Sequence, residues 1–363
     1  MQKRLFTILW CCALILLILF FPNTALSSAS SAISSWLNIV LPSLLPFCIA
    51  TSLLEECGAV AIFARRLQPL TTKVFGFSGV FSYAFLASCL SGYPMGAKIT
   101  SESYANGQLT QDEATEIINC TSTSGPMFLA GAVCIGMLGD SSMSKYLLLP
   151  HYLSALILAR SAGRRFRKKR LHTGSHPPGH ISPPPSVSFG VALSRSVAKG
   201  LDSMLAVGGF MVIYAVFAQC LLALFKCLPI IGANQTTRQL LSLGLGALEM
   251  TTGCIHSDSL PLFWRLLYLN AIISFGGFCI HSQTAAICAK NGVPIRHLFL
   301  HKAMQGALAA LLCLGLMYAL PIEPSLRPSH AAPSGSYLPM AAFLGLCALL
   351  CCFFCIRRRR KRN

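Results

Sequence analysis

Nine apolar runs follow one another along this sequence, and most are long enough to cross a bilayer. A spanning helix needs about 20 mainly apolar residues for a hydrocarbon core of about 30 Å. The composition agrees, because 54% of residues are hydrophobic and only 11% are charged. We therefore predict an all-α polytopic membrane protein with about nine spans in two related halves. The runs are residues 5–21, 36–54, 77–95, 114–138, 146–159, 203–225, 263–289, 299–320 and 337–356.

Some apolar stretches are interrupted. Residues 240–254 are too short and too rich in glycine for a full crossing, so we expect a re-entrant hairpin there. Residues 90–98, Leu-Ser-Gly-Tyr-Pro-Met-Gly-Ala-Lys, set a Gly/Pro break beside a lysine. Irregular backbone at bilayer depth survives only when it is buried in protein or lines a cavity. Secondary transporters build substrate sites from such broken helices, so the pattern favours transport over catalysis or scaffolding.

The net charge of +18 is concentrated at particular places. Thirteen of the 29 Lys and Arg residues lie in residues 160–170 and 357–362, each directly after an apolar run. Because cytoplasmic loops collect Lys and Arg, we expect the N-terminus, central linker and C-terminus to be cytosolic. The same clusters can contact anionic lipid headgroups. No aromatic motif for base stacking accompanies them, so we expect no nucleic-acid partner.

The 17 cysteines and the N-terminal run point to no separate chemistry. Most cysteines lie within apolar runs, where a thiol packs as a small hydrophobe, so we expect no metal or redox site and no cofactor.

The N-terminal run resembles a secretory signal but has 17 residues, longer than a typical signal core. We expect a retained first helix.

The chain divides into five parts. Shifting the sequence by 185 residues places the segment 91–98 over 276–283 and Asn106-Gly107 over Asn291-Gly292. Interrupted segments at matching positions of two halves point to the central site of a transporter. The parts are residues 1–35, an N-terminal membrane helix and outer loop; 36–159, a first membrane half; 160–190, a basic and proline-rich linker; 191–320, a second membrane half; and 321–363, a last membrane helix with a basic tail.

In the first half, two polar segments carry candidate substrate-binding residues. Lys98 either anchors its helix at the interface or faces a cavity as a ligand for an anion. Residues 119–126 end in Ser-Gly-Pro and expose N–H donors suited to carboxylates, unless their small side chains serve close helix packing. The candidates are Ser91, Gly92, Tyr93, Lys98, Ser122, Ser124 and Gly125.

The second half adds an acid and a short polar run. Glu249 lies within the expected hairpin, where a carboxylate is costly and is a functional hypothesis by default. It is a candidate for binding a coupling cation, carrying a proton, or pairing with Lys98. His281, Ser282 and Gln283 follow a Gly-Gly break in register with the Lys98 segment and are further substrate-binding candidates. We find no hydrolase, metalloprotease or nucleotide-binding motif, so we expect no enzyme.

Taken together, these polar segments within apolar sequence resemble those of the YlbJ (SpoVV) family of sporulation integral membrane proteins. The resemblance covers about residues 36–320 and places the chain near proteins with a nucleoside-recognition (Gate) domain. It implies an endospore-forming bacterium and movement of dipicolinic acid across the outer forespore membrane. Lys98 and helix N-termini would then hold the two carboxylates, and Tyr93 or Phe278 the ring.

Two rival functions remain open beside dipicolinate transport by alternating access. The Gate resemblance allows a nucleoside as the substrate. The basic loops also allow a membrane scaffold that recruits other sporulation proteins for spore cortex or coat assembly.

Overall fold

The computed structural model describes residues 2–173, 187–227, 235–320 and 322, and every regular element in them is a helix. The linker predicted at residues 160–190 is helical in part, because α8 continues to Thr173 and α9 begins at Phe189. The rest of the linker at 174–186, the apolar run 337–356 and the basic cluster 357–362 lie outside the described residues. The helices are α1 (Gln2–Phe20), α2 (Pro22–Ser35), η1 (Trp36–Val40), α3 (Leu41–Glu56), α4 (Ala59–Val74), α5 (Val80–Ser91), α6 (Met95–Ala105), α7 (Gln111–Cys120), η2 (Met127–Met137), η3 (Ser141–Met143), α8 (Ser144–Thr173), α9 (Phe189–Cys227), α11 (Gln235–Leu245), α12 (Met250–His256), η4 (Ser257–Ser259), α13 (Leu262–Phe275), α14 (Gly277–Lys290) and α15 (Leu298–Ala319).

Within the described residues, four helical segments are long and apolar enough to cross a membrane, so the expected nine spans are not confirmed. They are Pro22–Glu56, Phe189–Cys227, Leu262–Lys290 and Leu298–Ala319. The runs 77–95 and 114–138, which we expected to be spans, are each split, with α5 having only 12 residues and η2 only 11. These pieces are too short to cross a bilayer alone, so they must meet other elements at depth.

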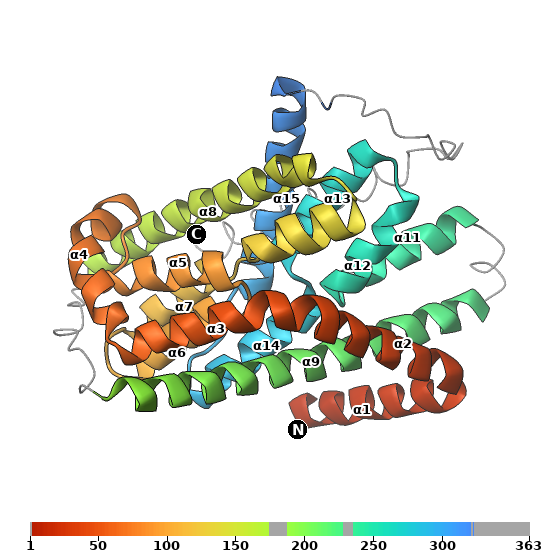
Figure 1. Ribbon diagram of the computed structural model, residues 1–363, viewed down its shortest axis with the longest axis horizontal. Helices are drawn as coiled ribbons and strands as arrows, with labels where there is room; N and C mark the ends of the chain where they lie inside the picture. Colours follow the sequence, from red (N-terminus) through yellow and green to blue (C-terminus); the bar gives the residue numbers. More distant parts are fainter. Residues whose placement is uncertain (1, 174–186, 228–234, 321, 323–363) are drawn as a thin grey trace.

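The prediction of a loop at residues 22–35 is wrong, because these residues form helix α2, which continues through η1 into α3. The continuous segment lies antiparallel to α9 (Figure 1). Its small buried residues Ala25, Ser28 and Ala32 allow the two helices to approach closely, which is how helices associate in a bilayer. The indole of Trp36 donates to the Met204 carbonyl at 3.0 Å. A Ser/Ala-rich stretch without charge is therefore a packing surface here.

Helix α13 occupies the centre of the second half. Every residue from 266 to 274 is buried, so α13 is enclosed on all sides. It packs against α15 and α8. Two of its polar side chains reach the first half, because Asn270 donates to the Tyr146 carbonyl at 2.9 Å and the Ser274 hydroxyl lies 2.8 Å from the His151 imidazole.

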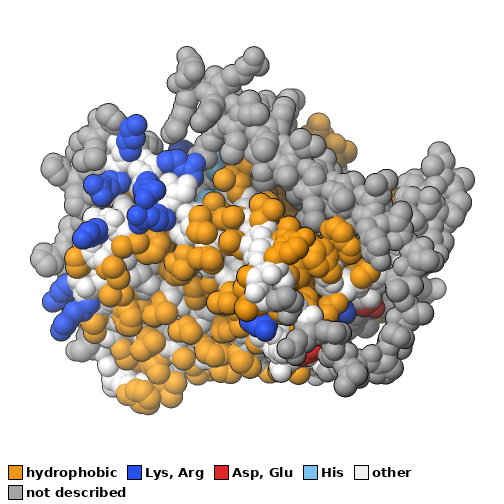
Figure 2. Space-filling view, turned by 90° about the horizontal axis from the view of Figure 1, so that it is seen from above, with side chains coloured by type: hydrophobic (Ala, Val, Ile, Leu, Met, Phe, Trp, Pro, Cys, Tyr) orange, Lys and Arg blue, Asp and Glu red, His pale blue; other side chains and the backbone are white. Residues whose placement is uncertain are grey.

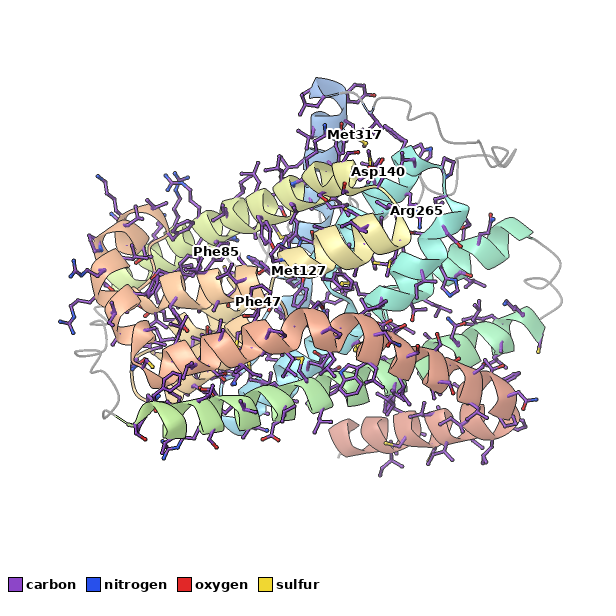
Figure 3. The ribbon with its side chains drawn as sticks, in the orientation of Figure 1. Phe47, Phe85, Met127, Asp140, Arg265 and Met317 are labelled. Atoms are coloured by element: carbon purple, nitrogen blue, oxygen red, sulfur yellow. The ribbon has the colours of Figure 1, made fainter. Side chains whose placement is uncertain are left out.

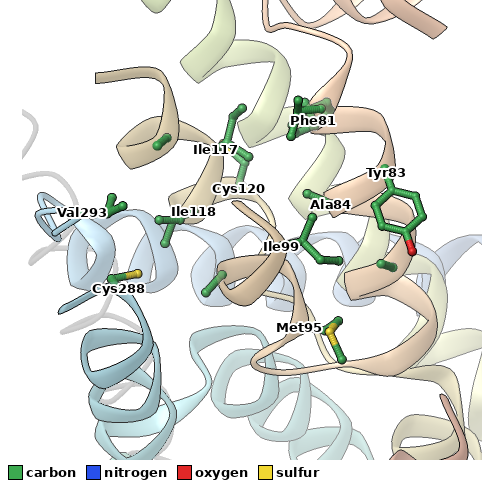
Figure 4. Close-up of a cluster of buried hydrophobic side chains, with 14 of the residues drawn as sticks. Phe81, Tyr83, Ala84, Met95, Ile99, Ile117, Ile118, Cys120, Cys288 and Val293 are labelled. Carbon is green, nitrogen blue, oxygen red and sulfur yellow. The ribbon is translucent and has the colours of Figure 1, made fainter. Parts of the chain in front are cut away.

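A separate apolar cluster joins α5, α6 and α7 to the end of α14. Phe81, Ile99, Ile117 and Val293 are among its buried side chains (Figure 4). Since Ile99 lies one turn after the α5–α6 interruption, this packing holds both pieces of the broken helix in place.

The two ends of the molecule differ in charge. Lys and Arg side chains gather at one end (Figure 2), where the Arg160 guanidinium donates to the Val74 carbonyl and ties α8 to α4. Asp140 and Arg265 lie away from that end, and Met127, which begins η2, lies near the middle (Figure 3). Although Met127 is itself exposed, the interruption before η2 is buried, because Thr121, Thr123 and Ser124 are almost inaccessible to solvent.

Candidate functional site

A small cavity lies where four interrupted segments meet. Its volume is about 50 Å³, enough for a few water molecules at about 10–15 Å³ each. It is lined from the α5–α6 break, the α7–η2 break, the start of α12 and the first turns of α14. Apolar side chains from the α2–α3 segment and α9, among them Leu44 and Met211, complete the wall.

Six of the eleven candidate residues line this cavity, although they come from widely separated parts of the chain. Tyr93, Glu249 and Gln283 are each more than nine-tenths buried. The six residues are Gly92, Tyr93, Ser124, Gly125, Glu249 and Gln283.

The other five candidates lie elsewhere. The Lys98 ammonium donates to the Ser52 hydroxyl on α3 at 3.3 Å. The His281 ring lies among the aromatic rings of α13, α14 and α15 and contacts the Phe275 carbonyl at 2.9 Å. The Ser282 hydroxyl is 2.5 Å from the Tyr214 hydroxyl. The remaining two, Ser91 and Ser122, are buried beside the cavity rather than in its wall.

Glycine allows the two first-half breaks to touch. Gly92 has φ +79°, and a Cβ there would lie 2.9 Å from the Gly125 nitrogen. Gly96 is tighter still, because its Cβ would lie 2.0 Å from the Thr121 carbonyl oxygen. A real side chain does not fit at such a distance, so the α5–α6 and α7–η2 breaks form one backbone-lined wall.

Glu249 caps α12. Its two carboxylate oxygens accept the backbone N–H groups of Thr251 at 2.9 Å and Thr252 at 2.6 Å, and the Thr252 hydroxyl donates to the second oxygen. The carboxylate therefore satisfies donors that the helix start leaves unpaired. Among the described residues it pairs with neither Lys98 nor another cation, so the expected Lys98–Glu249 ion pair is not formed.

We expect Glu249→Ala to lower the free energy of unfolding by about 0.5–2 kcal/mol, because two buried N–H groups lose their acceptor. Glu249→Gln keeps one carbonyl acceptor and should lose less. Thermal unfolding in detergent measures both, with Asp258→Ala at an exposed carboxylate as the control. Equal stability of Glu249→Ala and the control would contradict the capping role.

A buried lysine missed by the sequence reasoning lies behind the cavity wall. Lys302 on α15 is fully buried, and its ammonium donates to the Ser122 carbonyl and to the Gln305 side-chain oxygen at 2.5 Å. The same ammonium lies 5.3 Å from the centre of the Tyr93 ring, a cation–π contact. Among the described residues both ion pairs belong to Glu56, so no acid there neutralises Lys302.

The imidazole of His151 extends this polar region into α8. One ring nitrogen accepts the Ser124 N–H at 3.0 Å, and the other lies 2.8 Å from the Ser274 hydroxyl. Since His151 is 1% exposed, both contacts are shielded from water. The α7–η2 break is thus held by side chains from α8 and α15, and through Ser274 it is joined to α13.

One signal would have found Lys302. Lys302 lies within the apolar run 299–320. Burying a charged side chain there costs free energy, as it does for the Glu249 carboxylate. No Gly/Pro interruption marks Lys302, because α15 is an unbroken helix. His151 gave no comparable signal, since a single histidine in an apolar run is often a packing residue.

A second, more polar cavity opens near the basic end. Its volume is about 220 Å³, and its lining includes Arg165, Arg296, Asp112 and Glu116. Asn119 and His301 also line it, and they directly precede Cys120 and Lys302 in the chain. The larger cavity therefore reaches the residues that precede Cys120 and Lys302 in the chain.

No metal centre is apparent in the part of the chain that the structure describes, because no three His, Cys, Asp or Glu side chains gather there in a suitable group. The first cavity combines backbone N–H groups, an amide, a phenol and a carboxylate. Groups of these kinds are able to hydrogen-bond a polar organic molecule, although the Tyr93 hydroxyl and both Glu249 oxygens have partners within the protein.

Comparison with known proteins confirms the resemblance. Residues 37–141 match the Gate family model, described as nucleoside recognition. The chain is 26% identical over 315 residues to the sporulation integral membrane protein YlbJ of Bacillus subtilis strain 168, which covers 80% of this chain and 76% of that protein. No solved structure matches it. The chain is thus similar to an integral membrane protein of sporulation, and its apolar helices are those of a membrane protein.

Proposed function

We propose that this protein is a secondary transporter that moves dipicolinic acid across the outer forespore membrane by alternating access. The observation that carries the proposal is the convergence of four interrupted helices on one cavity, beside a buried lysine that has no acidic partner among the described residues. Broken helices at depth are the usual way in which secondary transporters build a central site. The resemblance to a sporulation membrane protein supplies the biological setting.

The charges around the cavity favour an anion that carries an aromatic ring. The Lys302 ammonium is taken out of water without a counter-ion, so a substrate carboxylate would supply the missing negative charge. The Tyr93 ring contacts that ammonium and also lines the cavity, where it can offer a stacking face. Glu249 on another wall repels carboxylates and so orients them toward Lys302, while the Gln283 amide donates hydrogen bonds.

At about 50 Å³ the cavity is too small for dipicolinate, so transport requires the interruptions to move. The 220 Å³ cavity at the basic end is the proposed entrance, since Arg165 and Arg296 attract anions there. The basic end faces the cytosol in this proposal, and its surface charge also meets anionic lipid headgroups. Substrate would pass from the entrance to Lys302 when the α7–η2 break opens.

The test is export of dipicolinate from non-sporulating cells that synthesise it and express this chain. Pools inside and outside the cells are compared with those of cells carrying an empty vector. External accumulation that requires the chain supports the proposal. Its absence, with the protein verified in the membrane, would rule out transport by this chain alone.

Within this assay, Gln283→Leu should lower the export rate about fivefold, because one neutral hydrogen bond to the substrate contributes about 1 kcal/mol. Gln111→Leu changes an exposed glutamine at the start of α7 and is the matched control. Export by Gln283→Leu at the rate of the control would remove Gln283 from the site.

A nucleoside is the second candidate substrate, favoured by the description of the family model that matches residues 37–141. Uridine or adenosine added in excess should leave dipicolinate export unchanged if the dicarboxylate is the true substrate. Strong competition by either nucleoside would shift the assignment to nucleosides.

A further inference from the structure

A group of charged side chains joins α3, α6 and α9 away from the cavity, and we call it the α3 cluster. Its members are Glu55, Glu56, Lys98, Glu102 and Lys199, and they influence one another electrostatically. Glu56 is well matched, because one oxygen accepts from the Lys199 ammonium at 2.7 Å and the other lies 3.6 Å from the Arg195 guanidinium.

Glu55 differs from its neighbour in the sequence. Both of its carboxylate oxygens are buried, and neither has a hydrogen-bond partner. The nearby Lys98 ammonium instead donates to Ser52, and the Tyr83 hydroxyl donates to the Thr51 carbonyl at 3.0 Å. A buried ionised carboxylate without donors is costly, and one proton on either oxygen removes most of that cost.

Charge accounting within the α3 cluster leads to the same result. Glu56 takes its positive charge from Lys199, while Arg195 is largely exposed to solvent. Lys98 is then the main opposite charge near Glu55, and its ammonium donates to Ser52 rather than to the Glu55 carboxylate. One proton on Glu55 removes the charge that no donor satisfies.

We propose that Glu55 is a proton-binding site that couples substrate movement to a proton gradient. A metal cation is disfavoured, because cations such as Ca²⁺ require six or more oxygen ligands and Mg²⁺ near-octahedral geometry, and the described residues show no such group. Glu249 is less suited to the role, since both of its oxygens already accept hydrogen bonds. The coupling role rests on the proposed transport function, whereas proton binding itself does not.

The α3 cluster is mechanically connected to the cavity. Helix α3 carries Leu44 in the cavity wall and Glu55 near its other end, and α6 begins directly after the Tyr93-Pro94 break. Protonation of Glu55 removes its attraction to Lys98 and so loosens α6 from α3. Helix α5 stays attached to α3 through Tyr83 and Thr51, so the break at Tyr93 takes up the movement.

Infrared difference spectroscopy on the purified full chain tests proton binding without any substrate. Spectra taken in acidic and alkaline buffers should show the carbonyl band of a protonated carboxyl group. The band should disappear in Glu55→Gln and persist in Glu56→Gln, the adjacent carboxylate that is ion-paired. Glu55→Asp, which keeps the carboxyl group, should retain a shifted band. Absence of the band in the unaltered protein, or its persistence in Glu55→Gln, would overturn the inference.

Transport then tests the coupling. In vesicles with a proton gradient, Glu55→Gln should lose gradient-driven dipicolinate accumulation but keep exchange of labelled for unlabelled substrate. Glu56→Gln should keep both. Accumulation by Glu55→Gln that still follows the gradient would refute coupling through Glu55. Failure of the unaltered protein to move dipicolinate would refute the proposed substrate, and the infrared result would stand apart from it.

Discussion

Replacing Lys302 with methionine should reduce dipicolinate export about 10- to 100-fold, because a hydrogen bond to a charged group contributes about 1.5–3 kcal/mol. The ammonium is fully buried and lies beside Ser122, Gln305 and the Tyr93 ring. Methionine keeps most of the side-chain length and is apolar, so the core should remain packed. The measurement is the ratio of exported to internal dipicolinate in expressing cells.

Two features make the Lys302→Met result interpretable. Lys302→Met removes the desolvation cost of a buried charge but leaves the Ser122 carbonyl and the Gln305 side-chain oxygen without their donor, so thermal unfolding in detergent is measured beside export. Loss of export by a variant that is folded and present in the membrane then reports on substrate recognition. Lys290→Met, at an exposed lysine that ends α14, is the matched control and should export normally. Normal export by Lys302→Met would mean that the buried ammonium plays no part in recognising the substrate.

Gly96→Ala should destabilise the protein by about 3 kcal/mol, since adding an atom to a packed core costs about 1–3 kcal/mol or more. The new Cβ would lie 2.0 Å from the Thr121 carbonyl oxygen, an atom of the backbone that no side-chain rotation can move away. The α6 helix must therefore shift, and the contact between the two first-half breaks opens. Thermal unfolding in detergent reports the change.

The control for Gly96→Ala is Gly131→Ala, because a Cβ at Gly131 on η2 meets no heavy atom within 4 Å. It should unfold at the temperature of the unaltered protein or slightly above, as alanine favours helix. If both variants unfold together, the close approach of α6 to Thr121 does not contribute to stability. Export by Gly96→Ala should fall in proportion to the protein that remains folded.

The interruptions could be predicted from the sequence, but their meeting point could not. Gly92, Gly125 and Gly276 mark breaks because glycine and proline disrupt helices in any context. Which breaks share a cavity depends on contacts between residues about 180 apart in sequence, such as the Tyr93 hydroxyl donating to the Ile273 carbonyl at 3.1 Å. Shifting the sequence by 185 residues aligns the segment 91–98 with 276–283, and the structure brings helices α6 and α14 of these segments into contact.

Charge was a less reliable guide. The position of Lys98 after a helix break predicts a substrate ligand, yet its ammonium donates to Ser52 on α3 and does not line the cavity. Lys302 was missed because α15 is regular. The direction of a side chain depends on the rotation of its helix, which the packing of several neighbouring helices decides. Local sequence around one charged residue does not contain that information.

The enclosure of α13 has a consequence for how the protein is made. Its side chains Asn270 and Ser274 bond to Tyr146 and His151 on α8, a helix synthesised more than 100 residues earlier. Until the ribosome has delivered α13, the Tyr146 carbonyl and the second ring nitrogen of His151 lack these two partners. The two halves therefore cannot mature one after the other, and a nascent chain that stops at the central linker should be a substrate for membrane quality-control proteases.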